Sequence, residues 1–434
     1  MMKPYPRYNQ SSARWYSFFP ETWSEVKAKR LFSNERERAS SEDEQLAASQ
    51  KYGVVPQALM MAQNNARVML ALKGTDNFKQ VKENDFVISL RSFEGGIEHS
   101  KYNGCISPAY TVLRLRHESS HPNYFRYALK CSPFIQALNS TSEGIRDGKT
   151  ITYDEFGELL VALPNQAEQK AIATFLDRET QRIDSLIEEK QTFIKLLKEK
   201  RQALISHVVT KGLNPNVEMQ DSGIEWIGQV PKHWVVGKIG YYARVINGST
   251  PSRANLSYWS KKEVPWLSSG SVNQYKITQA TEYISKDALK ECPIELLPVG
   301  TLVMGMIGQG KTRGLSALTQ IEATINQNLA AIITDSRLNS EYAHFQLQAA
   351  YNEIREFGRG GNQAALNCEL ISNFKITVPP VDEQKKIVSE LLNKSQITDE
   401  ILKEVEQSIT LLKEHRTSLI SAAVTGKIDV REAV

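Results

Sequence analysis

Residues 163–213 read LPNQAEQKAIATFLDRETQRIDSLIEEKQTFIKLLKEKRQALISHVVTKGL, and residues 378–428 read VPPVDEQKKIVSELLNKSQITDEILKEVEQSITLLKEHRTSLISAAVTGKI. These two stretches, which we call the arms, align without a gap at an offset of 215 residues, from Leu163 to Val378. Identical pairs at this offset include Glu168/Glu383, Gln169/Gln384, Lys170/Lys385, Arg201/Arg416, Ser206/Ser421 and Thr210/Thr425. Because an internal repeat decides the architecture of a chain, the rest of the sequence is interpreted around the arms.

The arms have the heptad pattern of a coiled coil. In the second arm the positions spaced by seven are Leu391, Thr398, Val405, Leu412 and Leu419, with Leu402 and Ile409 four residues after members of that series. The first arm repeats it with Leu176, Ile183, Lys190, Leu197 and Leu204, and with Ile187, Ile194 and Val208. This pattern predicts two long helices that pair along the seam, with packing of each helix on its own domain as the alternative. Arg201 and Arg416 fall inside the stripe, where they mark either the end of the seam or a buried polar contact.

A second, shorter repeat, which we call the echo, lies near the start of each half of the chain. The residues Pro20-Glu21-Thr22-Trp23 recur as Pro231-Lys232-His233-Trp234, while the sequence between the echoes and the arms differs between the halves. The repeat predicts a first domain over residues 1–162, a helix over 163–213, a second domain over 214–377, and a helix with a tail over 378–434. Both domains read as α+β, in the order strand, turn, strand, helix. The predicted elements are Asp85–Leu90, Tyr110–Leu115 and a helix over Asn123–Leu129, then Gly300–Met304, Ala330–Ile333 and a helix over Glu341–Tyr351.

Composition indicates an ordinary globular protein. The net charge is only +4, from 53 basic and 49 acidic residues, which permits nucleic-acid binding without demonstrating it. The four cysteines, Cys105, Cys131, Cys292 and Cys368, are scattered without a CxxC pair, which argues against a zinc site and against disulfides and fits a reducing cytoplasm. The N-terminus lacks the apolar core of a signal peptide, and no apolar run reaches the roughly 18 residues of a membrane span.

One motif imitates a zinc protease. The residues His117-Glu118-Ser119-Ser120-His121 match HExxH, which binds zinc only when both histidines lie on one helix face. Pro122 follows directly and disfavours a helical conformation at His121. We therefore predict a solvated loop between a strand and a helix, with no metal.

Another motif imitates a P-loop. The residues Gly305-Met306-Ile307-Gly308-Gln309-Gly310-Lys311-Thr312 follow a strand-like run, so a nucleotide-hydrolysing protein is an alternative function. A P-loop must open a helix, however, and Gly314 stands in the would-be first turn. The preferred interpretation is a basic, glycine-rich turn between two strands. We find no methyltransferase, nuclease or helicase motif in the chain, so it is predicted to lack a catalytic site.

The chain also carries family motifs in a fixed order. Each arm has Pro-x-x-x-Glu-Gln-Lys early and Leu-Leu-Lys-Glu-x-Arg-x-x-Leu-Ile-Ser late. The domains contribute Leu90–Glu98, Ser107–Tyr110, Thr250–Arg253, Gly308–Gly314, Asn326–Asn328 and Gly361–Gln363. In this order around a duplicated arm, they resemble the specificity (S) subunits of Type I restriction–modification enzymes over nearly the whole chain.

The resemblance implies a function and a set of partners. Each domain would be a target-recognition domain that reads one half of a split, asymmetric DNA site. The arms would pair as an antiparallel coiled coil and dock two methyltransferase (M) subunits, which motor–nuclease (R) subunits join. S-adenosylmethionine, ATP and Mg²⁺ would belong to those partners, and the location would be a bacterial or archaeal cytoplasm. A structural coiled-coil adaptor that never touches DNA is a second alternative.

Side chains that read base edges or hold phosphates supply the candidate DNA contacts. In the first domain they are Arg91, Ser92, Lys101, Tyr102, Arg146 and Lys149; in the second they are Arg253, Gln309, Lys311, Thr312, Arg313, Arg359, Asn362 and Gln363. Asn326–Asn328 is either a further contact or structural turn chemistry.

Overall fold

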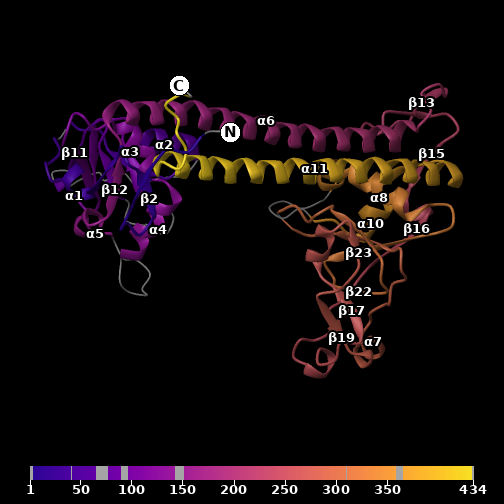
Figure 1. Cartoon of the computed structure of the whole chain (residues 1–434). Coiled ribbons are helices and arrows are strands. Elements are labelled where there is room, and N and C mark those ends of the chain that lie inside the picture. The colour runs from indigo at the N-terminus through magenta and orange to yellow at the C-terminus, as the bar shows by residue number, and fades with distance from the viewer. Residues whose placement is uncertain are drawn as a thin grey trace. The chain divides into compact units, whose positions relative to one another are not determined.

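The computed structural model describes residues 3–40, 42–64, 77–88, 96–141, 151–308, 310–357 and 365–432. The chain divides into two compact units. The first unit comprises Met1–Lys190 with Glu406–Val434, and the second comprises Gln191–Val405. The arms are the helices α6 (Gln166–Lys211) and α11 (Val381–Val424), so each unit contains one α+β domain and a part of both arms (Figure 1).

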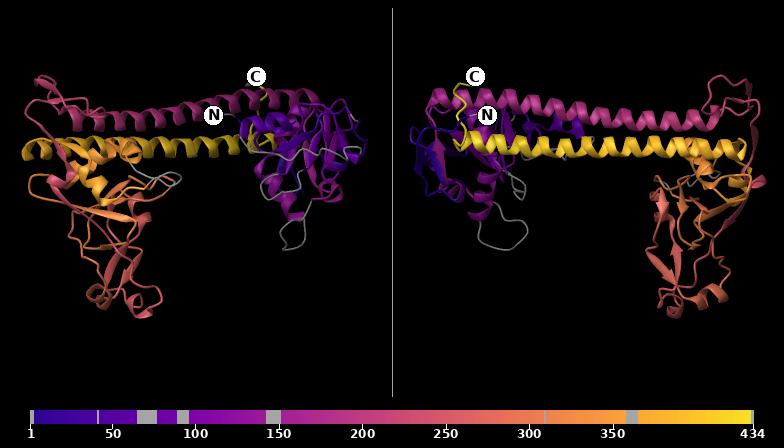
Figure 2. Two further views of the ribbon diagram at one scale, coloured as in Figure 1. Left: turned by 180° about the vertical axis from the view of Figure 1, so that it is seen from behind. Right: turned by 45° about the vertical axis from the view of Figure 1, so that its right-hand side comes forward.

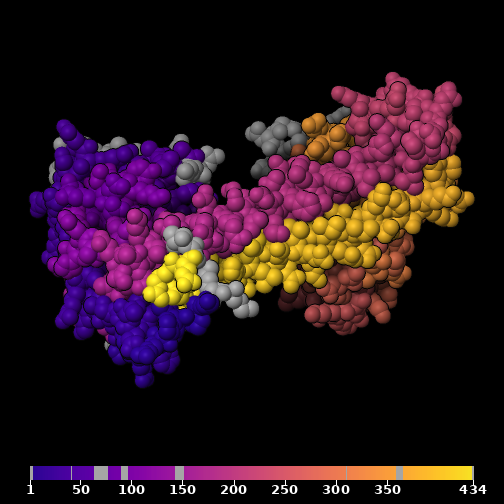
Figure 3. Space-filling view, turned by 45° about the horizontal axis from the view of Figure 1, so that its top comes forward, coloured from indigo at the N-terminus to yellow at the C-terminus, as the bar shows by residue number. Residues whose placement is uncertain are grey.

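The predicted seam is the contact between the two arms. Along the middle of α6, between Ile183 and Val208, the seam positions are buried or half-buried while most residues between them are exposed. In α11 the seam residues Leu402 and Ile409 are buried. Within each unit the arm segments lie side by side and run antiparallel (Figures 2 and 3). The sequence prediction of two long, mutually paired helices is therefore confirmed.

A four-stranded antiparallel sheet forms the centre of the first domain, in the order β4-β11-β8-β9. Its strands are β4 (Phe32–Glu35), β8 (Phe86–Ile88), β9 (Ile97–His99) and β11 (Thr111–Leu115), and the helices that follow are α3 (Pro122–Ala128), α4 (Ser132–Thr141) and α5 (Tyr153–Gly157). Shorter elements are α1 (Ala28–Leu31), β5 (Leu46–Ser49), β6 (Gly53–Pro56), α2 (Gln57–Asn64), β7 (Lys79–Val81) and β10 (Gly104–Ile106). The predicted strands and helix of this domain are confirmed, apart from Ser89 and Leu90, which lie outside the described residues.

The second domain repeats this antiparallel arrangement in β16-β23-β20-β21, and a fifth strand, β18, pairs with β21 in parallel. Its strands are β16 (Ala243–Asn247), β18 (Lys276–Ile277), β20 (Leu302–Gly305), β21 (Ser316–Thr319) and β23 (Leu329–Thr334), followed by α8 (Ser340–Ala349), α9 (Tyr351–Glu356) and α10 (Cys368–Asn373). The predicted helix over Glu341–Tyr351 is thus two helices that meet at Ala350. A small sheet of β17 (Val264–Leu267), β19 (Glu282–Ile284) and β22 (Thr324–Ile325) lies with α7 (Lys286–Glu291) at the end of the unit away from its arm segments (Figures 1 and 2).

The same junction joins each domain to the arms. Strand β12 (Leu160–Leu163) leads into α6 and pairs with β3 (Ser24–Lys27), as β24 (Lys375–Val378) leads into α11 and pairs with β15 (Val235–Lys238). The hairpins are β1 (Tyr8–Gln10) with β2 (Phe18–Pro20), and β13 (Met219–Asp221) with β14 (Gln229–Pro231).

The second sequence echo is explained at this junction. Trp23 and Trp234 are buried, and each donates its backbone N–H to the proline three residues earlier at 2.9 Å. A glycine at the end of an arm lies against each tryptophan, and a Cβ on Gly212 would lie 3.1 Å from the Trp234 ring. Gly212 and Gly426 both have positive φ, a conformation that glycine adopts without steric cost. The echoes therefore mark where each arm ends against a domain.

Candidate nucleic-acid interface

The HExxH motif does not lie on a helix. His117–His121 is a turn, in which the Ser120 N–H donates to the His117 carbonyl at 3.0 Å. His121 is the residue before α3, and Pro122 is the first residue of that helix, as the sequence predicted. No cluster of three potential metal ligands occurs in the part of the chain that the structure describes.

The P-loop-like motif is a loop between antiparallel strands. Gly305 ends β20 and β21 begins at Ser316, with no helix among the residues described between them. The base of the loop is closed by the Gly314 N–H, which donates to the Gly305 carbonyl at 2.8 Å, and by the Gly305 N–H, which donates to Leu315 at 2.9 Å. Because no helix N-terminus is available to hold phosphates, this loop is not a P-loop. We call residues 306–313 the hairpin loop.

The glycines of the motif allow a tight backbone path. A Cβ on Gly305 would lie 2.3 Å from the Thr312 carbonyl oxygen, and Gly308 has a φ of +137° with the Thr312 hydroxyl beside it. The fold thus explains Gly305 and Gly308 without a nucleotide. Lys311 is exposed, whereas Thr312 and Arg313 are half-buried.

Three sequence motifs of the second unit meet at one end of its sheet. The Met306 N–H, in the hairpin loop, donates to the Asn328 carbonyl at 2.9 Å. The Thr250 hydroxyl donates to the Gln327 side chain, and a Cβ on Gly248 would lie only 1.9 Å from the Ile325 carbonyl oxygen. Residues 248–253, the hairpin loop and residues 326–328 therefore form one surface, which we call the loop face.

Two predicted contacts on this surface also have structural roles. Asn326 is buried, and its side-chain oxygen accepts the Asn328 N–H at 3.1 Å, so turn chemistry accounts for it. The Arg253 guanidinium lies 3.6 Å from the centre of the Trp259 ring and forms an ion pair with Glu282 at 2.5 Å. Its side chain is still 56% exposed, so it remains a predicted DNA contact with one face already engaged.

The first unit separates its predicted contacts. Lys101 and Tyr102 are exposed in the turn between β9 and β10, which Ser100 braces by accepting the Tyr102 N–H at 3.2 Å. This turn follows His99, the last residue of β9, whereas the chain enters β9 after Gly96 at the other end of the strand. Lys101 and Tyr102 therefore lie at the end of the sheet opposite the β8–β9 connection. By its place in the strand order, that connection is the counterpart of the hairpin loop in the second domain.

Several candidate contacts are not described by the structure. They are Arg91, Ser92, Arg146, Lys149, Gln309, Arg359, Asn362 and Gln363, all outside the described residues. Their contact with DNA stays a prediction, as it does for Lys101, Tyr102, Arg253, Lys311, Thr312 and Arg313.

Charged groups buried elsewhere have structural roles. Asp85 is buried and accepts two hydrogen bonds at 2.8 Å from the Arg114 guanidinium, which also reaches Glu35 at 3.1 Å. The hydrogen bond to Asp85 raises the pKa of Arg114. Burial raises the pKa of Glu98, although Lys130 lies 2.6 Å away and opposes the shift. These pairs tie β4, β8, β9 and β11 to their neighbours.

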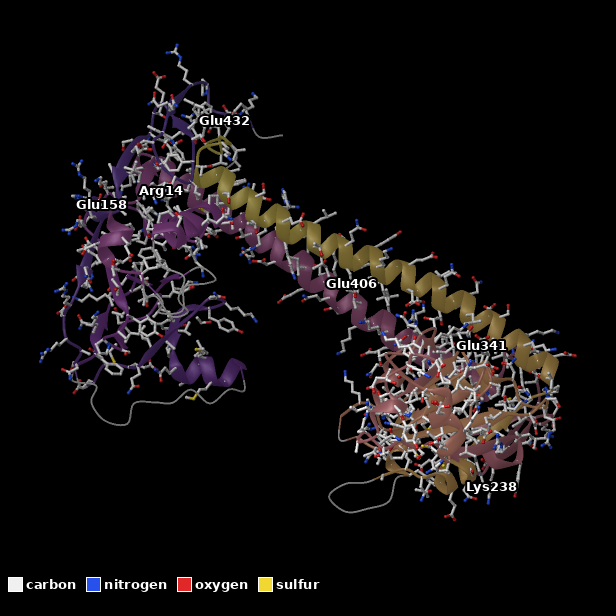
Figure 4. All side chains as sticks on the ribbon, turned by 90° about the horizontal axis from the view of Figure 1, so that it is seen from below. Arg14, Glu158, Lys238, Glu341, Glu406 and Glu432 are labelled. Carbon is white, nitrogen blue, oxygen red and sulfur yellow. The ribbon has the colours of Figure 1, made fainter. Side chains whose placement is uncertain are left out.

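Two surface cavities of the first unit adjoin the segment between β1 and β2. The larger, about 660 Å³, is lined by four aromatic residues together with Arg14 and Lys427. The smaller, about 370 Å³, includes Arg14 and Glu158 (Figure 4). Hydrogen bonds from Lys27 and Lys29 lower the pKa of Glu158 to about 2. Its carboxylate is therefore ionised and engaged by lysines, which does not suit a general acid.

Two residues beside the hairpin loop were not predicted from the sequence. Tyr351 and Arg355 on α9 donate hydrogen bonds to the carbonyls of Lys311 and Arg313, at 2.7 and 2.9 Å. Their spacing of four places them on one helix face, but such spacing is too common to single them out.

No helix in the described part of the chain combines the length and apolar character of a membrane span.

One family accounts for both halves of the chain. The sequence profile described as the Type I restriction modification DNA specificity domain matches residues 20–196 and, a second time, residues 231–411. The chain belongs to this specificity family. Each match takes in one α+β domain and most of the arm that follows it, so the family repeat coincides with the repeat of the arms.

Individual members of the specificity family resemble the chain to different extents. It is 26% identical over 179 residues to the Type I restriction enzyme EcoR124I/EcoR124II specificity subunit of Escherichia coli, a match that covers 39% of this chain and 43% of that relative. It is 23% identical over 360 residues to the Type I restriction enzyme MjaVIII specificity subunit of Methanocaldococcus jannaschii. That match covers 81% of this chain and 80% of that relative. The first match therefore spans less than half of the relative's length.

Solved structures share the fold of this family member. The HsdS subunit from Thermoanaerobacter tengcongensis superposes with a TM-score of 0.59 at 15% identity, over 95% of this chain and 99% of that chain. A chain from a study of assembly and conformational transition in the type I R-M system superposes with a TM-score of 0.74 at 14% identity, over 94% and 99%. At these identities the likeness concerns the fold, and it confirms the predicted fold class.

Proposed function

We propose that the chain recognises DNA for a Type I restriction–modification complex, with each unit reading one half of a bipartite, asymmetric target. The observation that carries the proposal is the double family match on one repeated sheet whose connecting loops differ between the units. A shared scaffold with dissimilar loops suits two readers of different sequence. An adaptor would need only the arms.

The loop face supplies suitable chemistry in the second unit. Lysine and arginine bind guanine edges and phosphates, and hydroxyl and amide side chains bind either base edges or the backbone. The hairpin loop carries Lys311, Thr312 and Arg313, and Gln327 is exposed beside it. We assign this surface to DNA contact in the second unit and the β8–β9 connection to contact in the first.

The arms are proposed to dock two methyltransferase subunits, which motor–nuclease subunits join. Leu196 and Leu411 occupy equivalent positions of the repeat, one in each unit, and are 55% and 58% exposed. Because the two leucines are equivalent in the repeat, they suit the docking of two equivalent partners. Replacing Leu196 or Leu411 with glutamate should therefore remove one methyltransferase copy, as native mass measurement would show. Two bound copies in both single variants would contradict this assignment.

Catalysis is assigned to the partners. S-adenosylmethionine, ATP and Mg²⁺ would bind the methyltransferase and motor–nuclease subunits, and the complex would act in the cytoplasm. Methyl transfer by the purified chain alone, supplied with S-adenosylmethionine, would contradict this.

A domain exchange tests the central proposal. A host would express the chain with its cognate methyltransferase, and its methylated sites would be mapped by sequencing. Replacing residues 18–159 with the corresponding domain of a relative should change one half of the methylated motif and leave the other half intact. A motif that is altered in both halves, or a wild-type complex without any motif, would refute the two-reader function.

A further inference from the structure

One short helix, α9, holds residues 311–313, at the C-terminal end of the hairpin loop. The Tyr351 hydroxyl donates to the Lys311 carbonyl at 2.7 Å, and Arg355 Nη1 donates to the Arg313 carbonyl at 2.9 Å. The two side chains also contact each other, because Arg355 Nη1 lies 3.1 Å from the Tyr351 hydroxyl. We call Tyr351 and Arg355 the α9 clamp.

The backbone of the loop is built to accept this clamp. Gly314 has a φ of +81°, and a Cβ there would lie 3.2 Å from Arg355 Cγ and 3.4 Å from Ile354 Cγ2. A larger residue at position 314 would push α9 away from the loop. The close approach of α9 and the glycine therefore belong to one arrangement.

The other attachments of the loop lie at its base. They join Gly305 to Gly314 and Leu315, Met306 to Asn328, and Leu366 to the Met306 carbonyl at 2.9 Å. The clamp supplies two hydrogen bonds from α9 to residues 311–313. The positions of Lys311 and Arg313 therefore depend on α9 as well as on the strands.

A loop that reads bases must hold its side chains to within about 0.5 Å of the productive geometry. A loop that is fixed before binding also avoids the entropy cost of ordering on the DNA. The clamp ties down two backbone carbonyls, which are acceptors that a phosphate would repel, and places an arginine next to them. It leaves the Lys311 side chain exposed.

We propose that Tyr351 and Arg355 are positioning residues that set the sequence discrimination of the second unit without contacting a base. This inference rests on the proposed function, because it takes the hairpin loop to be the reading element. It adds a second layer, in α9, to a site that sequence motifs place only in the loops.

The test uses the full chain in complex with its methyltransferase. Binding would be measured on the methylated target and on duplexes with one base pair changed in either half-site. For Tyr351→Phe we expect discrimination in one half-site to fall about twofold to tenfold, the effect of losing one hydrogen bond, while the other half-site is read as before. Arg355→Lys keeps the charge but loses the planar fork, so it should lower discrimination in the same half-site.

Arg337→Lys is the matched control. Arg337 also donates to a backbone carbonyl, that of Tyr241, and pairs with Asp335, but it follows the end of β23 away from Asn328. This variant should leave discrimination unchanged. Melting temperatures for all variants would show whether the second unit stays folded, and Tyr351→Phe tests the clamp if the arginine variant unfolds.

The outcomes separate the competing roles. Loss of a phosphate contact weakens binding to all sequences alike, whereas loss of positioning narrows the gap between right and wrong sequences. Uniform weakening in Arg355→Lys with normal discrimination in Tyr351→Phe would overturn the proposal, as would wild-type discrimination in both. A wild-type complex that does not discriminate at all would refute the proposed function, and this inference with it.

Discussion

The two units keep their arm junctions and differ in their loops, and the kind of contact explains which parts are kept. Gln169 accepts the His121 N–H at 2.8 Å and donates to the Pro164 carbonyl at 2.8 Å. Gln384 accepts the Asn339 N–H at 2.7 Å and donates to Pro379 at 2.8 Å. Both glutamines bond to backbone groups, so the side chain at the contacted position is free to be histidine or asparagine. Contacts to backbone allow two dissimilar domains to use one junction.

The arms show the repeat as an exchange of partners. In the first unit Asp184 pairs with Arg416 at 2.9 Å, and in the second unit Arg201 pairs with Asp399. Asp184 and Asp399 are equivalent under the 215-residue offset, and so are Arg201 and Arg416. The two arginines within the predicted stripe are therefore polar contacts between the arms. Each unit contains the same ion pair with the roles of the arms reversed.

A buried tyrosine sharpens the comparison. Tyr124 donates to the carbonyls of Ala162 and Val424, at 3.0 and 3.3 Å. Tyr342 occupies the corresponding place but shares a side-chain network, 2.8 Å from both the Thr377 hydroxyl and the Gln346 amide. The first unit satisfies this hydroxyl with backbone alone, and the second does so with backbone and side chains.

Replacing either of these tyrosines should have the largest effect on stability. Both are fully buried, so Tyr124→Ala and Tyr342→Ala should each lower the free energy of unfolding of their unit by about 3–5 kcal/mol. The phenylalanine variants separate the units. Tyr124→Phe should cost about 1–3 kcal/mol because it removes the side-chain donor to the buried Ala162 and Val424 carbonyls, and Tyr342→Phe should cost less because Gln346 and Thr377 still bond to each other and to the Val209 carbonyl. Calorimetric unfolding would measure all four, and equal losses in the two phenylalanine variants would contradict the comparison.

Acid should destabilise both units through different histidines. Burial lowers the pKa of His344 to about 4, with a smaller contribution from Lys276, and burial with Arg126 and Lys101 lowers the pKa of His99 to about 4. An unfolded histidine takes up its proton near pH 6.5, so the stabilisation is complete above that pH and is lost as the pH falls from about 6.5 towards 4.

The corresponding measurement compares unfolding at pH 7 and pH 5. Each histidine should account for about 2 kcal/mol of lost stability over that interval. His344→Gln should make the second unit less sensitive to pH, and His99→Gln should do so for the first. Unchanged pH sensitivity in both variants would show that other groups govern the acid response.

A longer arm should move the two half-sites apart on the DNA. Inserting four residues after Glu189 should lengthen α6 by ~6 Å, which corresponds to about one or two base pairs of DNA. We expect the spacer between the half-sites to grow by that amount while the half-site sequences stay unchanged, because no reading residue is altered. Mapping of methylated sites would show this.

A control insertion keeps both arms intact. Four residues after Gly223, which has open space around its Cβ in the β13–β14 connection, should leave the spacer as it was. An unchanged spacer in an active arm-insertion variant would show that α6 does not set the distance. A changed half-site would show that the arm takes part in reading.

The sequence predicted the arms well because a heptad pattern depends only on local periodicity. It also predicted the β20–β21 turn, since Gly314 ruled out the helix that a P-loop requires. It missed the β17–β19–β22 sheet, whose strands of two to four residues are too short to show a period. The α9 clamp was invisible because Tyr351 and Arg355 act on backbone carbonyls 40 and 42 residues away in sequence. Such long-range contacts leave no local signature.

The smallest expected effect is the coupling energy of the two ion pairs between the arms. Asp184 and Arg416 have side chains that are 54% and 37% exposed, so solvent screens their attraction, and a double-mutant cycle should give a coupling of about 0.2–1 kcal/mol. Arg201 is less exposed, at 27%, and also donates to the Ser395 carbonyl at 2.9 Å, so it is held in place more firmly. We therefore expect the coupling between Arg201 and Asp399 to exceed that between Arg416 and Asp184.

Reversing both charges of a pair, as in Asp184→Arg with Arg416→Asp, should restore most of the stability that either single change removes. Both couplings should shrink in 1 M salt, where the screening length falls to about 3 Å. Couplings that are equal in the two units would mean that the repeat is symmetric in energy as well as in sequence, and a coupling that persists in high salt would mean that hydrogen-bond geometry, rather than charge, holds the arms in register.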